Sequence, residues 1–211
     1  MLKLNHSISR IEAFSDAVFA FSATLMVVSL GSGDSFLELK NNFKNFISFG
    51  VSFFVLIALW KLHYNYFRRN SYIDNLIITY NSILLFVVLY FVFPLKSMTS
   101  TLLRQVGISI EDLASLFVLY SLGFLLIFLC FSLMYKRAYK NSKTNNVSLL
   151  FYSRHFFIFV LVSIISIILA IFKIGVTFGL PGFVYAILGP LCYFHSVKFQ
   201  AKYGNIQPNK L

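Results

Sequence analysis

Six stretches of the 211-residue chain are each long and apolar enough to cross a lipid bilayer as a helix. A hydrocarbon core about 30 Å thick needs roughly 20 helical residues at a rise of about 1.5 Å per residue. The stretches that meet this length cover residues 11–30, 43–67, 72–95, 112–135, 149–172 and 180–197. Because only short loops separate them, we expect one all-α, six-helix transmembrane domain over residues 1–211.

The composition excludes a water-soluble protein. Apolar residues make up 58% of the chain and charged residues only 12%, with a mean hydropathy of +0.78, whereas soluble domains carry about 25% charged residues. The same composition excludes a disordered chain and a small scaffold held together by disulfide bonds. The net charge of +11 would suit a nucleic-acid partner, but the basic residues lie in short clusters between apolar runs. In a membrane protein such clusters indicate orientation, so we expect no nucleic-acid partner.

The basic residues are distributed unequally between the two sides of the predicted membrane. One side, which includes the N-terminus, holds Lys3, Arg10, Arg68, Arg69, Lys136, Arg137, Lys140, Lys143, Arg154, Lys198, Lys202 and Lys210. The other side holds Lys40, Lys44, Lys96, Arg104 and Lys173. Since cytoplasmic loops carry the excess of Lys and Arg, we expect a multi-pass protein of the cell membrane with both termini in the cytoplasm.

The first predicted helix has two chemically different faces. At about 100° per residue, one face is an apolar stripe with a single hydroxyl, made of Phe21, Thr24, Leu25 and Val28. The opposite face carries polar residues near the N-terminal end of the helix, namely Glu12, Ser15 and Asp16.

The polar face needs partners, because ionisable groups at membrane depth are costly. The economical arrangement is hydrogen bonding to neighbouring helices. Trp60 and His63 share one face of the second helix, and Asn81 lies on the third helix at a reachable depth. We therefore expect Asp16 and its neighbours to join the first helix to these three side chains.

The stretch from Arg10 to Leu25 resembles the R-x-x-x-F-S-D signature of the transmembrane protein 175 family, which comprises the lysosomal potassium channel of animals and its prokaryotic homologues. The signature residues are Arg10, Phe14, Ser15 and Asp16. Further matches follow along the chain at Trp60, His63, Phe67, Asn81, Pro94, Arg154 and His155. The resemblance extends over all six predicted helices.

This resemblance implies a homotetramer in which each first helix lines a central potassium pathway. Family members lack the T-V-G-Y-G filter, and so does this sequence. The family's apolar constriction falls on Phe21, the adjacent polar layer on Thr24, and further layers on Leu25 and Val28. The resemblance together with the helical phase implies a structural clamp of Arg10, Phe14, Ser15, Asp16, Trp60, His63 and Asn81. The family usually has Ile or Leu where this chain has Phe21.

Two other classes of function stay open at this point. A proton-coupled secondary transporter would use Asp16 and Glu12 as carriers. A membrane enzyme or haem protein would use His63, His155 and His195. Cys130 and Cys192 lack metal-ligand spacing, so we expect no metal site. The potassium channel implied by the resemblance has no catalytic residues and needs no cofactor beyond the permeant potassium ion.

Overall fold

The computed structural model describes residues 7–28, 43–104, 108–141 and 146–203. Among these described residues, six helical segments are long and apolar enough to cross a membrane. The elements are α1 (Ile8–Val28), α3 (Phe43–Arg69), α4 (Asn75–Arg104), α5 (Ile110–Asn141), α6 (Val147–Ile171), η1 (Val176–Phe178), α7 (Leu180–Phe183), η2 (Val184–Ile187) and α8 (Leu188–Tyr203). The predicted all-α, six-helix membrane fold is confirmed.

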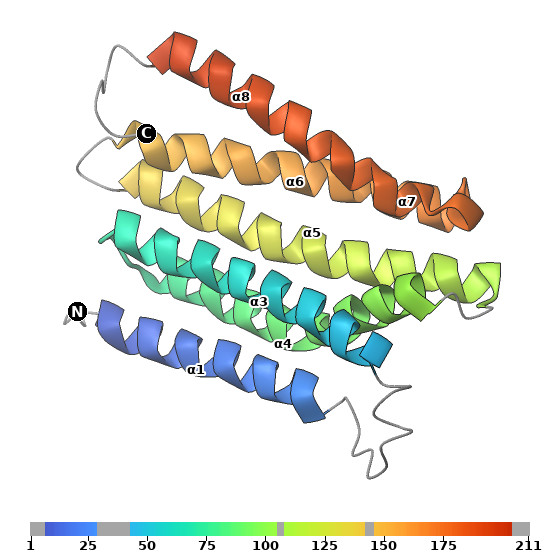
Figure 1. Cartoon of the computed structure of the whole chain (residues 1–211). Helices are drawn as coiled ribbons and strands as arrows, with labels where there is room; N and C mark the ends of the chain where they lie inside the picture. Colours follow the sequence, from blue (N-terminus) through green and yellow to red (C-terminus); the bar gives the residue numbers. More distant parts are fainter. Residues whose placement is uncertain (1–6, 29–42, 105–107, 142–145, 204–211) are drawn as a thin grey trace.

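The helices form an antiparallel bundle whose spatial order follows the chain (Figure 1). On one side α1 packs against both α3 and α4, and on the other side α8 packs against α6 and η2. Between them, α4 contacts α5, and α5 contacts α6 most extensively. This order places α1 and α8 at opposite edges of the bundle.

Aromatic rings and small residues hold α5 against its neighbours. The rings of Phe128 and Phe159 stack at 4.4 Å between α5 and α6. Ser132 and Ser153 each donate a hydroxyl hydrogen to the other residue's carbonyl, at 2.9 and 3.0 Å. Small residues allow such close approach of helices in a membrane.

Gly123 of α5 faces the ring of Phe91 of α4. A Cβ atom placed on this glycine would lie 2.5 Å from a ring carbon of Phe91. The absence of a side chain at residue 123 therefore permits the α4–α5 contact.

The third spanning helix differs from the predicted range of residues 72–95 at both ends. It begins at Asn75 because Asp74 caps it, its Oδ1 accepting the Ile77 backbone N–H at 2.9 Å. It also continues past Pro94 to Arg104. Pro94 removes one backbone donor, but an interior proline does not end a helix whose other backbone bonds remain.

The last spanning segment is irregular over its first third, from Leu180 to Ile187. A short α-helical turn, α7, is followed by the 3₁₀ turn η2, and regular α-helix resumes at Leu188. Pro190 has no N–H for the carbonyl of Ala186, and its ring crowds that carbonyl. Pro190 therefore accounts for the irregular turn that ends at Ile187, just before it.

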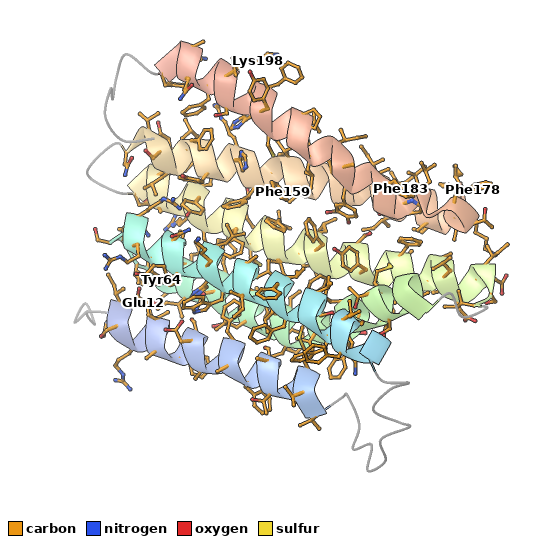
Figure 2. The ribbon with its side chains drawn as sticks, viewed as in Figure 1. Glu12, Tyr64, Phe159, Phe178, Phe183 and Lys198 are labelled. Atoms are coloured by element: carbon orange, nitrogen blue, oxygen red, sulfur yellow. The ribbon has the colours of Figure 1, made fainter. Side chains whose placement is uncertain are left out.

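Charged side chains of the described residues gather at the two ends of the bundle. Lys198 of α8 lies at the same end as Glu12 of α1, and Phe178 and Phe183 lie at the other end (Figure 2). At the basic end, Arg137 Nε donates to Asp74 Oδ2 at 2.7 Å. At the opposite end, exposed Lys173 and Glu111 approach to 2.8 Å.

Candidate functional site

Helix α1 presents one face to the bundle and leaves the other uncovered. The side chains buried against α3 and α4 are those of Ser15, Phe19, Ser22 and Met26. On the opposite side, Phe21 is 55% exposed and Val28 72% exposed. The helical periodicity of the sequence predicted these two faces, and they direct the polar and the apolar groups to different surroundings.

A hydrogen-bonded chain of three side chains joins α1, α4 and α3. Asn81 Nδ2 donates to Ser15 Oγ at 3.1 Å, and Ser15 Oγ donates to the Ile11 carbonyl at 2.8 Å. His63 Nε2 lies 2.8 Å from Asn81 Oδ1, and because that oxygen only accepts, the imidazole donates. All three side chains are buried, so the chain satisfies polar groups that have no water to bind.

A second connection runs from Asp16 of α1 to Trp60 of α3. The indole Nε1–H donates to Asp16 Oδ1 at 2.7 Å. Phe19 and Phe67 lie on either side of the His63 ring, at ring-centroid distances of 5.5 and 4.9 Å. The structure thus brings together five of the seven side chains expected in the clamp, namely Ser15, Asp16, Trp60, His63 and Asn81.

The other two signature residues, Arg10 and Phe14, do not join these contacts. Phe14 is 64% exposed, and Arg10 is exposed with no hydrogen-bond partner among the described residues. Residues 10 and 14 precede Phe21 by about three and two complete helical turns. They therefore lie on the uncovered face of α1, and no clamp contact is seen for them.

The predicted stripe lies on that uncovered face. Phe21, Thr24 and Val28 are exposed, and Leu25 is half-buried at its edge. Thr24 Oγ1 donates to the Ala20 carbonyl at 3.1 Å. Since the hydroxyl hydrogen is directed along the helix, the oxygen lone pairs remain available beyond the helix surface.

Sequence reasoning missed a cluster of hydroxyl groups that joins α3 and α4 at the end opposite the clamp. Ser48 Oγ lies 2.7 Å from Thr99 Oγ1 and 2.9 Å from Ser100 Oγ, and Ser52 Oγ lies 2.9 Å from Thr99 Oγ1. The signal was present in the sequence, because Ser48 and Ser52 are four residues apart on one apolar helix.

The remaining membrane-embedded histidines lie between α6 and α8. The rings of His155 and His195 are 5.7 Å apart, and Phe151 stacks on both, at 5.4 and 5.0 Å. His63 is distant in the chain and bonded to Asn81. Within the described residues, no three His, Cys, Asp or Glu side chains form a group that could hold a metal ion.

Comparison with known proteins gives matches over the part of the chain that contains this site. A family model for the endosomal/lysosomal potassium channel TMEM175 matches residues 10–94. A potassium channel of Marivirga tractuosa is 39% identical over 147 residues, or 63% of this chain and 60% of that protein. A potassium channel of Chamaesiphon minutus is 26% identical over 147 residues, or 64% of this chain and 66% of that protein. The chain thus matches less than two thirds of the length of these curated relatives.

Two crystal structures resemble the whole bundle. A variant of the potassium channel MtTMEM175, solved with a nanobody–MBP fusion, superposes with a TM-score of 0.77 at 30% identity, covering 98% of this chain and 95% of that chain. A lysosomal potassium-selective channel TMEM175 homologue from Chamaesiphon minutus superposes with a TM-score of 0.62 at 20% identity, covering 91% and 97% of the two chains. The second likeness concerns the fold alone.

Proposed function

This chain belongs to the TMEM175 family, and from that premise we propose that it is a channel that conducts potassium ions across a membrane. The observation that carries the proposal is the uncovered face of α1, with Thr24 among the apolar Phe21 and Val28, opposite a face bonded to the bundle. One face of α1 is hydrogen-bonded to the bundle and the opposite face is uncovered. Such a helix suits a position between the bundle and a pore.

The proposed assembly is a homotetramer with four copies of α1 around one axis. A single stripe cannot enclose a pathway, and a closed ring of identical subunits is the common way to do so. The basic end of the bundle, which carries Arg68, Arg69 and Arg137, would face the cytoplasm according to the excess of positive charge there.

Phe21 forms the apolar constriction in this proposal. An ion that leaves water loses hydration at an apolar ring, which opposes conduction unless the ring stays wide enough to keep some water. A phenyl ring is bulkier than the Ile or Leu usual in the family. Four rings would therefore either close the pathway by dewetting or turn their faces toward the cation.

Thr24 forms the polar layer next to this constriction, about one helical turn away. Each of the four hydroxyl oxygens has lone pairs directed away from the helix, because the hydrogen is donated to the Ala20 carbonyl. Four such oxygens would replace part of the hydration shell of a potassium ion. Leu25 and Val28 would line the pathway beyond this layer.

Ion flux from liposomes that hold purified protein tests the proposal. Under an imposed voltage we expect potassium flux above that of protein-free liposomes. Phe21→Ala should raise the flux and weaken discrimination against sodium, whereas Thr24→Val should reduce the preference for potassium without stopping the flux. Phe157→Ala, which removes an exposed ring on α6, is the matched control and should change neither.

Three outcomes would overturn parts of the proposal. Folded protein that passes no potassium contradicts a channel, and a saturable flux with a fixed proton stoichiometry indicates a transporter that uses Asp16 and Glu12. A cysteine at position 21 that water-soluble reagents never reach contradicts the constriction.

A further inference from the structure

A cavity of about 660 Å³ opens at the end of the bundle opposite the basic end. Its walls come from the last turns of α4, the first turns of α5 and the η1–α7–η2 segment. This volume lies in the range of pockets that hold small organic ligands. Phe178 and Phe183, which are among its lining residues, are visible at this end in Figure 2.

The lining chemistry excludes a charged ligand. Among the described lining residues, none carries a formal charge, and the polar side-chain groups are the hydroxyls of Thr101, Thr177, Tyr120 and Tyr185. The charged residues at this end include Lys173 and Glu111, whose side chains approach each other at 2.8 Å. Burial of an ion among these apolar walls would lack compensation.

The cavity extends into the depth of the hydrocarbon region. Leu113, Phe117 and Tyr120 line it from one face of α5. The seven residue steps from Leu113 to Tyr120 correspond to about 10 Å along the membrane-crossing direction. Thr101, the last residue of the apolar span of α4, also lines the cavity. An occupant would thus lie parallel to the acyl chains of one leaflet, whose hydrocarbon is about 15 Å thick.

Backbone geometry shapes the wall formed by the η1–α7–η2 segment. Gly175 and Gly179 have φ values of 63° and 72°, a conformation that side chains disfavour, and they bend the chain around η1. A Cβ atom on Gly182 would lie 3.1 Å from the Phe117 ring. The wall is therefore defined by turns and close packing.

The position of the cavity in the bundle indicates what reaches it. Its walls belong to α4, α5 and the segment before α8, while α1 lies at the other edge of the bundle (Figure 1). In an assembly arranged around α1, this side faces the bilayer. We propose that the cavity is a binding site for one acyl chain of a phospholipid from the leaflet at this end.

Photo-crosslinking tests the proposal in reconstituted full-length protein. The probe is phosphatidylcholine with a diazirine on a mid-chain carbon, used at increasing fractions in unlabelled phosphatidylcholine. We expect crosslinks concentrated on the lining residues of α4, α5 and η1. Thr101→Phe, which fills the cavity, should reduce them at least fivefold, while crosslinks to exposed Tyr193 and Phe194 of α8 stay unchanged.

Ser115→Phe is the matched control, because Ser115 lies on α5, is exposed and does not line the cavity. It should leave the crosslinking of the cavity at the level of the unmodified protein.

Leu113→Phe provides a second filling variant if Thr101→Phe does not fold. Crosslinks that are insensitive to both filling variants contradict the site. Protection of the lining residues from the probe also contradicts it and indicates that a second copy of the chain covers the cavity. No ion flux is measured, so failure here is separate from failure of the proposed channel function.

Discussion

The interface between α1 and the α3–α4 pair contains a chain of buried polar side chains, whereas α5 and α6 contact each other through aromatic rings over several turns. At the first interface, Asn81 joins Ser15 to His63. At the second, ring pairs such as Phe128–Phe159 and Phe131–Phe156 lie 4.4 and 5.5 Å apart. In a bilayer, lipid tails solvate apolar surfaces as well as a neighbouring helix does. The α5–α6 pair therefore depends mainly on dispersion contacts, to which the Ser132–Ser153 hydrogen bonds add. Helix α1, with one face uncovered, depends more on directional bonds that fix its rotation.

The largest effect is expected where the dispersion contacts are densest. Phe156→Ala removes a buried ring that lies within 5.7 Å of Phe128, Phe131 and Tyr135, and a loss of roughly 3 kcal/mol is typical of such a cavity. The free energy of unfolding in detergent and denaturant measures it. Phe157→Ala truncates the neighbouring exposed ring and should cost far less; equal losses would mean that α5–α6 packing is not decisive.

The next effect is expected at the centre of the polar interface. Asn81→Ala leaves His63 buried without its partner, and such an unsatisfied group costs about 1–3 kcal/mol, whereas Ser15 keeps its bond to the Ile11 carbonyl. We expect lower thermal stability together with reduced potassium flux at equal protein content. The control is Ser82→Ala, which changes an exposed hydroxyl bonded within α4. Wild-type stability of Asn81→Ala would contradict a clamp held by this residue.

A smaller effect is expected at Asp16, whose side chain is exposed. Asp16→Ala removes the acceptor for the Trp60 indole and should destabilise the protein by about 1 kcal/mol, while Asp16→Asn keeps an acceptor oxygen and should recover most of that loss. Trp60 is the single tryptophan of the chain, so its emission spectrum reports the bond directly. Unchanged stability of Asp16→Ala with altered ion selectivity would instead place Asp16 in the ion pathway.

The smallest effect concerns pH and the loop before α4. Burial alone would raise the pKa of Asp74, but the Ile77 amide, Arg137 and Tyr72 outweigh it and hold this pKa below its ordinary value. A lowered folded-state pKa stabilises the protein fully above the ordinary value of about 3.9, and this contribution is lost as pH falls through the lowered pKa. Melting temperatures of the protein and of Asp74→Asn should therefore converge below about pH 4. A constant difference between them down to pH 2 would contradict this.

The sequence predicted the six helices and the partners of the polar interface because both follow from the free-energy cost of placing polar groups in the hydrocarbon of a bilayer. Apolar length determines the spans, and a polar group at the depth of Ser15 requires a partner at the depth of His63 and Asn81. Helical phase also separates the two faces of α1, and applied to Arg10 and Phe14 it places them with Phe21. The family signature grouped them with Asp16 because a sequence motif lists residues without regard to direction.

Other features could not be read from local sequence. The extension of α4 beyond Pro94 depends on the surrounding helices, and the cavity behind Thr101 depends on how the turn at Gly179 returns against α5. The uncovered stripe at Phe21 is predicted by periodicity, but local sequence does not show which surface covers it.

The contact between Gly123 and Phe91 has a consequence for how the chain can diverge. The two residues share one volume, since a Cβ atom at residue 123 would lie 2.5 Å from the Phe91 ring. Across related sequences, a larger residue at the position of Gly123 should therefore occur together with a smaller one at the position of Phe91. Substitutions at the two positions should be correlated, although 32 residues separate them in the chain.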